Sequence, residues 1–223
     1  MAEARDPKPG GARRGGAAPG GAGPGGARSG GAAGRRRPAR DRLLAAAAAR
    51  FYADGIAATG IDTVTADAGV AKMSLYNNFA SKADLVAAYL VARHEEWLGL
   101  YAARLAAAGD DPRARVLAVF DAYADHANAG YAHGFRGCGL LNAAAELPAG
   151  DPGRAVVRGH KEEVEAIVAG HLADLPGDPS RAAALAEHLA FLLEGSMARA
   201  GLEGDDARLR RARALAADLL DAV

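Results

Sequence analysis

Residues 59–79 read TGIDTVTADAGVAKMSLYNNF, and this stretch decides the fold. Gly69 divides it, and we predict one short helix over about 61–68 and a second over about 72–79. Apolar side chains recur on the inner side of both helices and of the turn, at Ile61, Val64, Val70, Leu75 and Phe79. Small residues around Gly69 let the two helices cross closely at a steep angle, so the pattern predicts a helix-turn-helix.

The second of these helices carries hydrogen-bonding side chains on its outer side. Because the apolar positions face inward, the residues left to face outward are Lys72, Met73, Ser74, Asn77 and Asn78. Asparagine bridges adenine N6 and N7, lysine binds guanine or phosphate, and an apolar group contacts the thymine methyl. The set therefore predicts a helix that reads the major groove of double-stranded DNA.

The blocks AGVAKMSLYNNF at 68–79 and SKADL at 81–85 resemble the DNA-binding domain of TetR/AcrR-type bacterial repressors. The resemblance is strong over 41–85, and beyond it the agreement is mainly in the number of helices. It implies that Tyr76 gives its hydroxyl to a phosphate and that Lys82 contacts the DNA backbone.

Two positions depart from the family pattern. Gly60 stands where a Ser or Thr cap is usual, and Asp62 places a carboxylate close to DNA, where phosphate repels it unless it faces its own helix N-terminus. Other roles stay open for several residues of this region: packing for Tyr76, a helix cap for Asn77 and Asn78, and a solvated surface position for Lys72 and Lys82.

The composition indicates an all-α protein. The 223 residues include 59 alanines, whereas Val, Ile and Thr together number 17, and alanine favours helices as β-branched residues favour sheets. We predict about nine helices, three small ones in front and a larger bundle behind. They cover 41–54, 61–68, 72–79, 81–107, 112–129, 139–147, 152–175, 179–200 and 205–222.

Residues 1–40 differ in composition from everything that follows. They hold 12 of the 29 glycines, five of the ten prolines, and nine basic residues against two acidic ones. With almost no large apolar side chain, this segment is predicted to be a disordered basic tail. Residues 41–85 then form the helix-turn-helix domain and 86–223 the effector-binding and dimerisation domain. Four arginines beside the first helix, Arg35, Arg36, Arg37 and Arg40, are expected to reach DNA, with a solvated linker as the alternative.

The resemblance implies a small-molecule pocket in the helices after residue 85. We expect an apolar or aromatic effector, because such pockets are mostly apolar with a few polar groups. The candidate pocket residues are His94, Trp97, Tyr101, Tyr123, Cys138, Asn142, Glu146 and His160. Each histidine is alternatively an ordinary core or surface residue, and Cys138 a small buried hydrophobe or a thiol sensor.

The last two predicted helices, 179–200 and 205–222, carry apolar stripes. These comprise Leu185, Leu189, Leu192, Leu193 and Met197 in the first, and Leu209, Leu215, Leu219 and Leu220 in the second. As in the resembled family, we expect them to pair with those of a second subunit, giving a homodimer. A twofold dimer implies a roughly palindromic operator with half-sites about 34–36 Å apart.

These features predict a ligand-responsive transcriptional regulator, a repressor that a small molecule releases from DNA. An enzyme is the second hypothesis, but HExxH, GxSxG and P-loop patterns do not occur. A nucleic-acid protein acting through its tail alone is the third, and it leaves the large helical region without a role. No cofactor, metal or membrane association is expected: Cys138 is the single cysteine, and no apolar run approaches about 20 residues. Because no signal-peptide core is found, we expect a cytoplasmic protein.

Overall fold

The computed structural model describes residues 38–176 and 178–222, and all regular structure in these ranges is helical. The predicted tail, with Arg35, Arg36 and Arg37, lies outside the described residues. The nine helices of the described ranges are α1 (Pro38–Asp54), α2 (Ile61–Ala68), α3 (Lys72–Tyr76), α4 (Lys82–Ala108), α5 (Pro112–Ala127), α6 (Gly139–Glu146), α7 (Pro152–Ala173), α8 (Pro179–Glu203) and α9 (Ala207–Asp221). The all-α prediction is confirmed.

Three helix boundaries differ from the prediction by several residues. The helix α1 begins at Pro38, so that Arg40 belongs to a helix. The helix α3 ends at Tyr76, because the Asn78 N–H turns back to the Leu75 carbonyl (2.9 Å) as the chain bends to insert Phe79 into the core. The helix α8 continues to Glu203 and ends at Gly204, whose φ of 81° is left-handed and favours glycine.

Aspartate side chains start three of the bundle helices. Asp111, Asp151 and Asp178 each precede a proline, and each carboxylate accepts the backbone N–H two residues further on. Each of these bonds satisfies a backbone N–H of the first turn, which has no acceptor within the helix. Proline is well tolerated at the first helical position. Ser81 caps α4 in a related way, since its hydroxyl accepts the Asp84 N–H at 3.1 Å.

The helices α1, α2 and α3 share a small core of their own, which we call the head (residues 38–79). Its buried side chains include Leu43, Ala47, Phe51, Val64, Ala68, Leu75 and Phe79. At the turn, Gly69 has φ 61° and ψ 41° and caps α2 with its N–H. The helix-turn-helix is therefore built as predicted, and on α1 Leu43 is the fully buried leucine.

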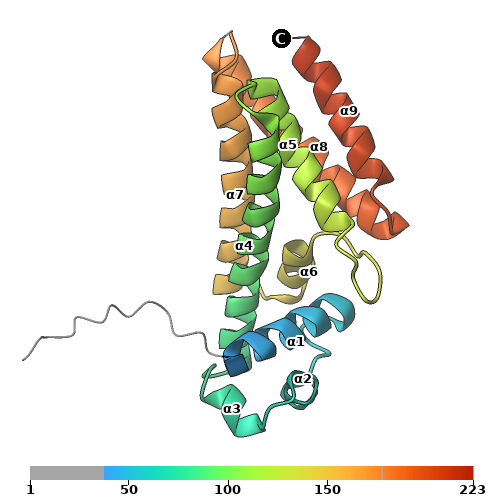
Figure 1. The fold of residues 1–223 in the computed structure, drawn as a ribbon. Coiled ribbons are helices and arrows are strands. Elements are labelled where there is room, and N and C mark those ends of the chain that lie inside the picture. The colour runs from blue at the N-terminus through green and yellow to red at the C-terminus, as the bar shows by residue number, and fades with distance from the viewer. Residues whose placement is uncertain (1–37, 177, 223) are drawn as a thin grey trace, which may run out of the picture. The chain divides into compact units, whose positions relative to one another are not determined.

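The remaining helices form the bundle behind the head. The helix α4 packs on α5 and α7, α7 packs on α8, and α9 packs on α5 and α8. Figure 1 shows the head at the end of α4 where that helix begins, with α7 beside α4. In the described part of the chain, no helix is both long and apolar enough to cross a membrane.

Candidate functional site

The outer face of α3 exposes two large side chains. Met73 is 70% exposed and Tyr76 is 47% exposed, whereas Leu75 between them is fully buried. Lys72 and Asn77 are also exposed, and Ser74 is half-buried. A five-residue helix anchored by one leucine thus presents a thioether, a phenol and an ammonium to solvent, and Asn77 just after it adds an amide. This mixed set can contact base edges and phosphates.

Asp62 faces Lys72 across the turn. The Lys72 Nζ lies 2.7 Å from the Asp62 carboxylate, and this hydrogen bond raises the pKa of Lys72. Both side chains are more than half exposed, so the pair is weak and its partners exchange readily. The aspartate that departs from the family pattern therefore neutralises the first basic residue of α3.

Asn78 points back to its own chain. Its side-chain amide donates to the Ser74 carbonyl at 2.7 Å, which caps the end of α3. DNA contact and helix capping were both possible roles for Asn78, and in the structure its side chain caps the helix. Asn77 has its side chain exposed to solvent.

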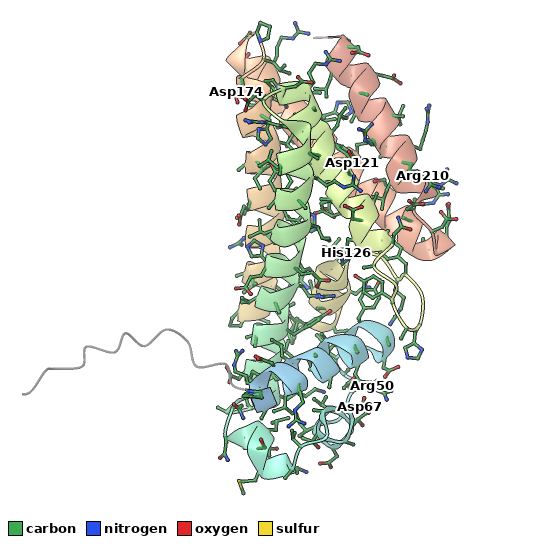
Figure 2. All side chains as sticks on the ribbon, viewed as in Figure 1. Arg50, Asp67, Asp121, His126, Asp174 and Arg210 are labelled. Carbon is green, nitrogen blue, oxygen red and sulfur yellow. The ribbon has the colours of Figure 1, made fainter. Side chains whose placement is uncertain are left out.

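Two arginines of α1, Arg40 and Arg50, contact other side chains of the head. The guanidinium of Arg40 lies over the Phe79 ring, 5.0 Å from its centre. Arg50 donates to Asp67 of α2 at 2.6 Å and also pairs with Asp54, and this guanidinium lowers the pKa of Asp67 (Figure 2). The Arg50–Asp67 pair ties α1 to α2.

Lys82 and Glu146 meet at the peptide of Ile56, in the turn after α1. The Ile56 N–H donates to Glu146 Oε1 at 2.9 Å, and the Ala57 N–H donates to Glu146 Oε2 at 2.7 Å. From the other side, Lys82 Nζ donates to the Ile56 carbonyl at 2.6 Å. Glu146 is one of the predicted pocket residues, but its carboxylate joins α6 to the head, and Lys82 is engaged within the protein.

A second joint between head and bundle involves Tyr52 of α1. Its hydroxyl accepts the Arg136 N–H at 2.6 Å and donates to the Gly137 carbonyl at 3.1 Å, and its ring stacks on Tyr131 at 4.2 Å. The Arg136 side chain donates to the Tyr52 carbonyl at 2.7 Å. Asn142, another predicted pocket residue, instead donates to the Arg136 carbonyl at 3.0 Å. Sequence reasoning missed Tyr52 and Arg136, because nothing local marks partners 84 residues apart.

The predicted pocket residues of α4, α5 and α7 do come together. Trp97 stacks on Tyr101 with ring centres 5.4 Å apart, and its ring also lies 5.4 Å from Tyr123 and 5.3 Å from His160. The Nδ1 atoms of His94 and His160 are 3.0 Å apart, so one donates to the other. The Tyr101 hydroxyl lies 2.5 Å from His171 Nε2.

The cavity inside this cluster is small. Its volume is about 20 Å³, room for about one water, whereas drug-sized ligands occupy sites of about 300–1,000 Å³. It is lined by Arg93, Trp97, Tyr123, His126, Cys138, Gly139, Leu140 and His160. Half of the eight predicted pocket residues therefore line it, and His94 and Tyr101 pack onto Trp97 or His160.

Burial controls the protonation of the cluster. It lowers the pKa of His160 to about 3 and that of His126 to about 4, so both imidazoles are neutral at pH 7. Lys161, which sequence reasoning missed, lies 2.7 Å from the Glu194 carboxylate and 3.5 Å from both Tyr123 Oη and Cys138 Sγ. In the described residues, no three His, Cys, Asp or Glu side chains are placed to hold a metal ion.

The leucine stripes of α8 and α9 face mainly inward, although Leu185, Leu192, Leu215 and Leu219 are only half-buried. Leu189, Leu193 and Met197, with Leu209 and Leu220, are almost completely buried within the chain itself, so they are unavailable to a partner. A different stripe of α8 faces outward, and its members are Ala184, His188, Phe191, Gly195, Ala198 and Leu202. Phe191 is 66% exposed and Leu202 is 84% exposed, which is unusual for such large apolar side chains.

Comparison with known proteins agrees with this architecture. The family described as bacterial regulatory proteins, tetR family, matches residues 43–89, which cover most of the head and the start of α4. A search of curated proteins found no significant match.

Among solved structures, a putative TetR transcriptional regulator from Streptomyces avermitilis is 32% identical, with a TM-score of 0.63, over 83% of this chain and 99% of that one. The regulatory protein TetR from Rhodobacter sphaeroides is 26% identical, with a TM-score of 0.67, over 81% of this chain and 97% of that one. A TetR-family transcriptional regulator from Streptomyces coelicolor is 31% identical, with a TM-score of 0.72, over 81% of this chain and 93% of that one. With this identity over nearly the whole relative, and with a matching helix-turn-helix, the chain belongs to the TetR family of DNA-binding transcriptional regulators.

Proposed function

We propose that this regulator is a repressor that binds a palindromic operator as a homodimer and is released from it by a small molecule. The observation that carries the DNA contact is the exposed face of α3, with Met73 and Tyr76 in solvent beside Lys72 and Asn77. A large apolar side chain exposed on a very short helix has no packing role, and it suits contact with a thymine methyl in the major groove.

Contact with phosphates is shared among several basic and hydroxyl groups. Lys72 leaves Asp62 for a phosphate or base at little cost, because the pair is exposed. Tyr76 offers its hydroxyl to a phosphate. The basic residues of 1–37, including Arg35, Arg36 and Arg37, add attraction that depends on salt concentration.

The homodimer forms through α8 and α9. The outward stripe of α8 supports this, because Phe191 and Leu202 leave apolar surface that a second copy would cover, while Gly195 and Ala198 between them allow close helix approach. Twofold symmetry then places two copies of α3 on successive turns of the major groove.

The effector acts through α4. This helix begins at Lys82, against the head, and carries Trp97 in the aromatic cluster about 22 Å further along, at 1.5 Å per residue. A ligand larger than the present cavity must push the walls apart, and α4 then shifts relative to the turn at Ile56. That shift alters the spacing of the two heads, and the ligand favours the released state by its higher affinity for it.

Selection of DNA sequences by the purified full-length protein tests the proposal. A palindromic consensus, bound by a dimer, is the expected outcome. Selection of unrelated sequences, or binding that competing bulk DNA removes completely, would contradict sequence-specific repression and favour a general nucleic-acid binder. A small molecule that releases the selected operator would identify the effector class.

A further inference from the structure

A second, larger hollow lies between the head and the bundle. Its volume is about 390 Å³, within the range of small-molecule sites. We call it the joint cleft, and its lining residues are Ala48, Ala49, Arg50, Tyr52, Ala53, Asp67, Arg93, Glu96, Ala129, Tyr131, Ala132 and His133. They come from α1, α2, α4 and the α5–α6 loop, so anything bound there touches the head and the bundle together.

Arg93 of α4 lines the joint cleft and carries an unpaired hydrogen-bond donor. Its side chain is only 17% exposed and pairs with Glu96, yet its Nε–H is buried with no acceptor among the described residues. An unsatisfied buried donor is costly, and a ligand that accepts from it removes that cost. The charge of the guanidinium makes the resulting hydrogen bond stronger than one between neutral groups.

The same arginine also lines the small cavity beside Trp97. The indole N–H of Trp97 is likewise buried without an acceptor in the described part of the chain, in a side chain that is 4% exposed. On the other side of the wall, Tyr131 lines the joint cleft while its hydroxyl lies 3.0 Å from Nδ1 of His126, which lines the cavity. The two spaces are therefore neighbours, separated by side chains, and each is lined by a residue with a buried, unpaired N–H.

The rest of the lining limits the chemistry of the ligand. Five alanines and two tyrosine rings make most of the surface apolar. The charged groups already compensate one another, Arg50 with Asp67 and Arg93 with Glu96, so the cleft does not select an ion. Glu96 Oε2 is also buried without a hydrogen bond, but it lies against the Arg93 guanidinium, which compensates its charge. The group left for a ligand is the Arg93 Nε–H donor, and it requires an acceptor.

We propose that the joint cleft binds a neutral, mainly apolar molecule with a carbonyl oxygen, such as a ketone or lactone, which accepts a hydrogen bond from Arg93 Nε. This inference rests on the proposed function only for its consequence, that the bound molecule alters the attachment of α1 to the bundle. Because Arg50 links the cleft wall to α2, a ligand here acts directly on the helix-turn-helix.

The probe is prodan, a neutral aromatic ketone whose emission rises and shifts to the blue when it leaves water. Full-length protein without DNA is titrated with it, so that the result does not depend on operator binding. Saturable binding is expected, and Ala132→Phe, which fills the cleft from an exposed loop, should weaken it at least tenfold. The matched control is Ala103→Phe on an exposed face of α4 away from the cleft, which should bind like the unmodified protein.

Competition tests the acceptor. 2-Acetylnaphthalene should displace prodan at a concentration at least about tenfold lower than either of two other competitors requires. These are 2-ethylnaphthalene, which lacks the oxygen, and 2-naphthoate, which is charged. Arg93→Lys, which keeps the charge and removes Nε–H, should abolish this preference. Should this variant unfold, the Ala132→Phe comparison still decides the location of the site.

Equal binding by Ala132→Phe and Ala103→Phe, or equal competition by the three naphthalenes, would overturn the proposal. Operator release is measured separately, with the selected DNA and the same ketone. Binding in the cleft without release would contradict the ligand response of the proposed function but leave the binding site standing.

Discussion

Replacing Glu146 by glutamine should loosen the joint between head and bundle. In the folded protein, the two carboxylate oxygens accept the N–H groups of Ile56 and Ala57 at 2.9 and 2.7 Å. Glutamine has the same shape but a single acceptor oxygen, and its NH₂ group would face a backbone donor. One of the two hydrogen bonds is therefore lost, and the other loses its charge.

The magnitude follows from the environment of the two amides. A hydrogen bond to a charged group contributes about 1.5–3 kcal/mol and one between neutral groups about 0.5–1.5 kcal/mol. The Glu146 side chain and Ala57 are exposed, so water replaces part of what is lost, whereas Ile56 is buried. We expect the free energy of unfolding to fall by about 1–2 kcal/mol, or the melting midpoint by roughly 2–8 °C for a domain of this size.

Two measurements check this expectation. Chemical denaturation gives the change in stability, and amide hydrogen exchange gives the local effect, because Ile56 and Ala57 should exchange faster in the variant. The control is Glu95→Gln, an exposed glutamate of α4 for which no ion pair is found in the described part of the chain. If Glu146→Gln has the stability of the control and unchanged exchange at residues 56 and 57, the joint has been misassigned.

Three further predictions concern the DNA face, the histidines and the dimer. Lys72→Ala, Tyr76→Phe and Asn77→Ala should each weaken operator binding by roughly 1–3 kcal/mol with unchanged circular dichroism, and wild-type affinity in all three would refute the α3 assignment. Since burial lowers the pKa values of His160 and His126 to about 3 and about 4, the unfolded chain binds more protons between pH 6.5 and 4. The free energy of unfolding should therefore fall by about 2 kcal/mol for each of the two histidines from pH 7.5 to pH 5. His160→Gln should remove the share of His160, which is about half of the combined fall. Denaturation curves of equal midpoint at the two pH values would contradict this prediction. Phe191→Glu should convert a dimer to a monomer in sedimentation while Val91→Glu, at a 45% exposed position of α4, should not; a dimer in both variants would place the interface elsewhere.

The helices and the reading face could be predicted from the sequence because they depend on neighbours in the chain. Gly69 and the spacing of Val64, Leu75 and Phe79 specify two short helices with one buried side each, and the structure has both. Once those positions are buried, helical geometry places Met73 and Tyr76 on the opposite side. The end of α3 was missed by three residues, because the turn at Asn78 depends on where Phe79 must enter the core.

The partners of each side chain were decided only by the tertiary structure. Glu146 and Trp97 both lie in helices with apolar faces, yet one meets a turn about 90 residues away and the other a cluster of rings. Leu189 and Leu193 of the expected stripe on α8 pack into their own chain, whereas Phe191 and Leu202 remain outside. Periodicity along a helix tells which residues share a face, but it carries no information on which other surface covers that face. That choice depends on how all the helices pack together at close contact, and it is made between residues far apart in the chain.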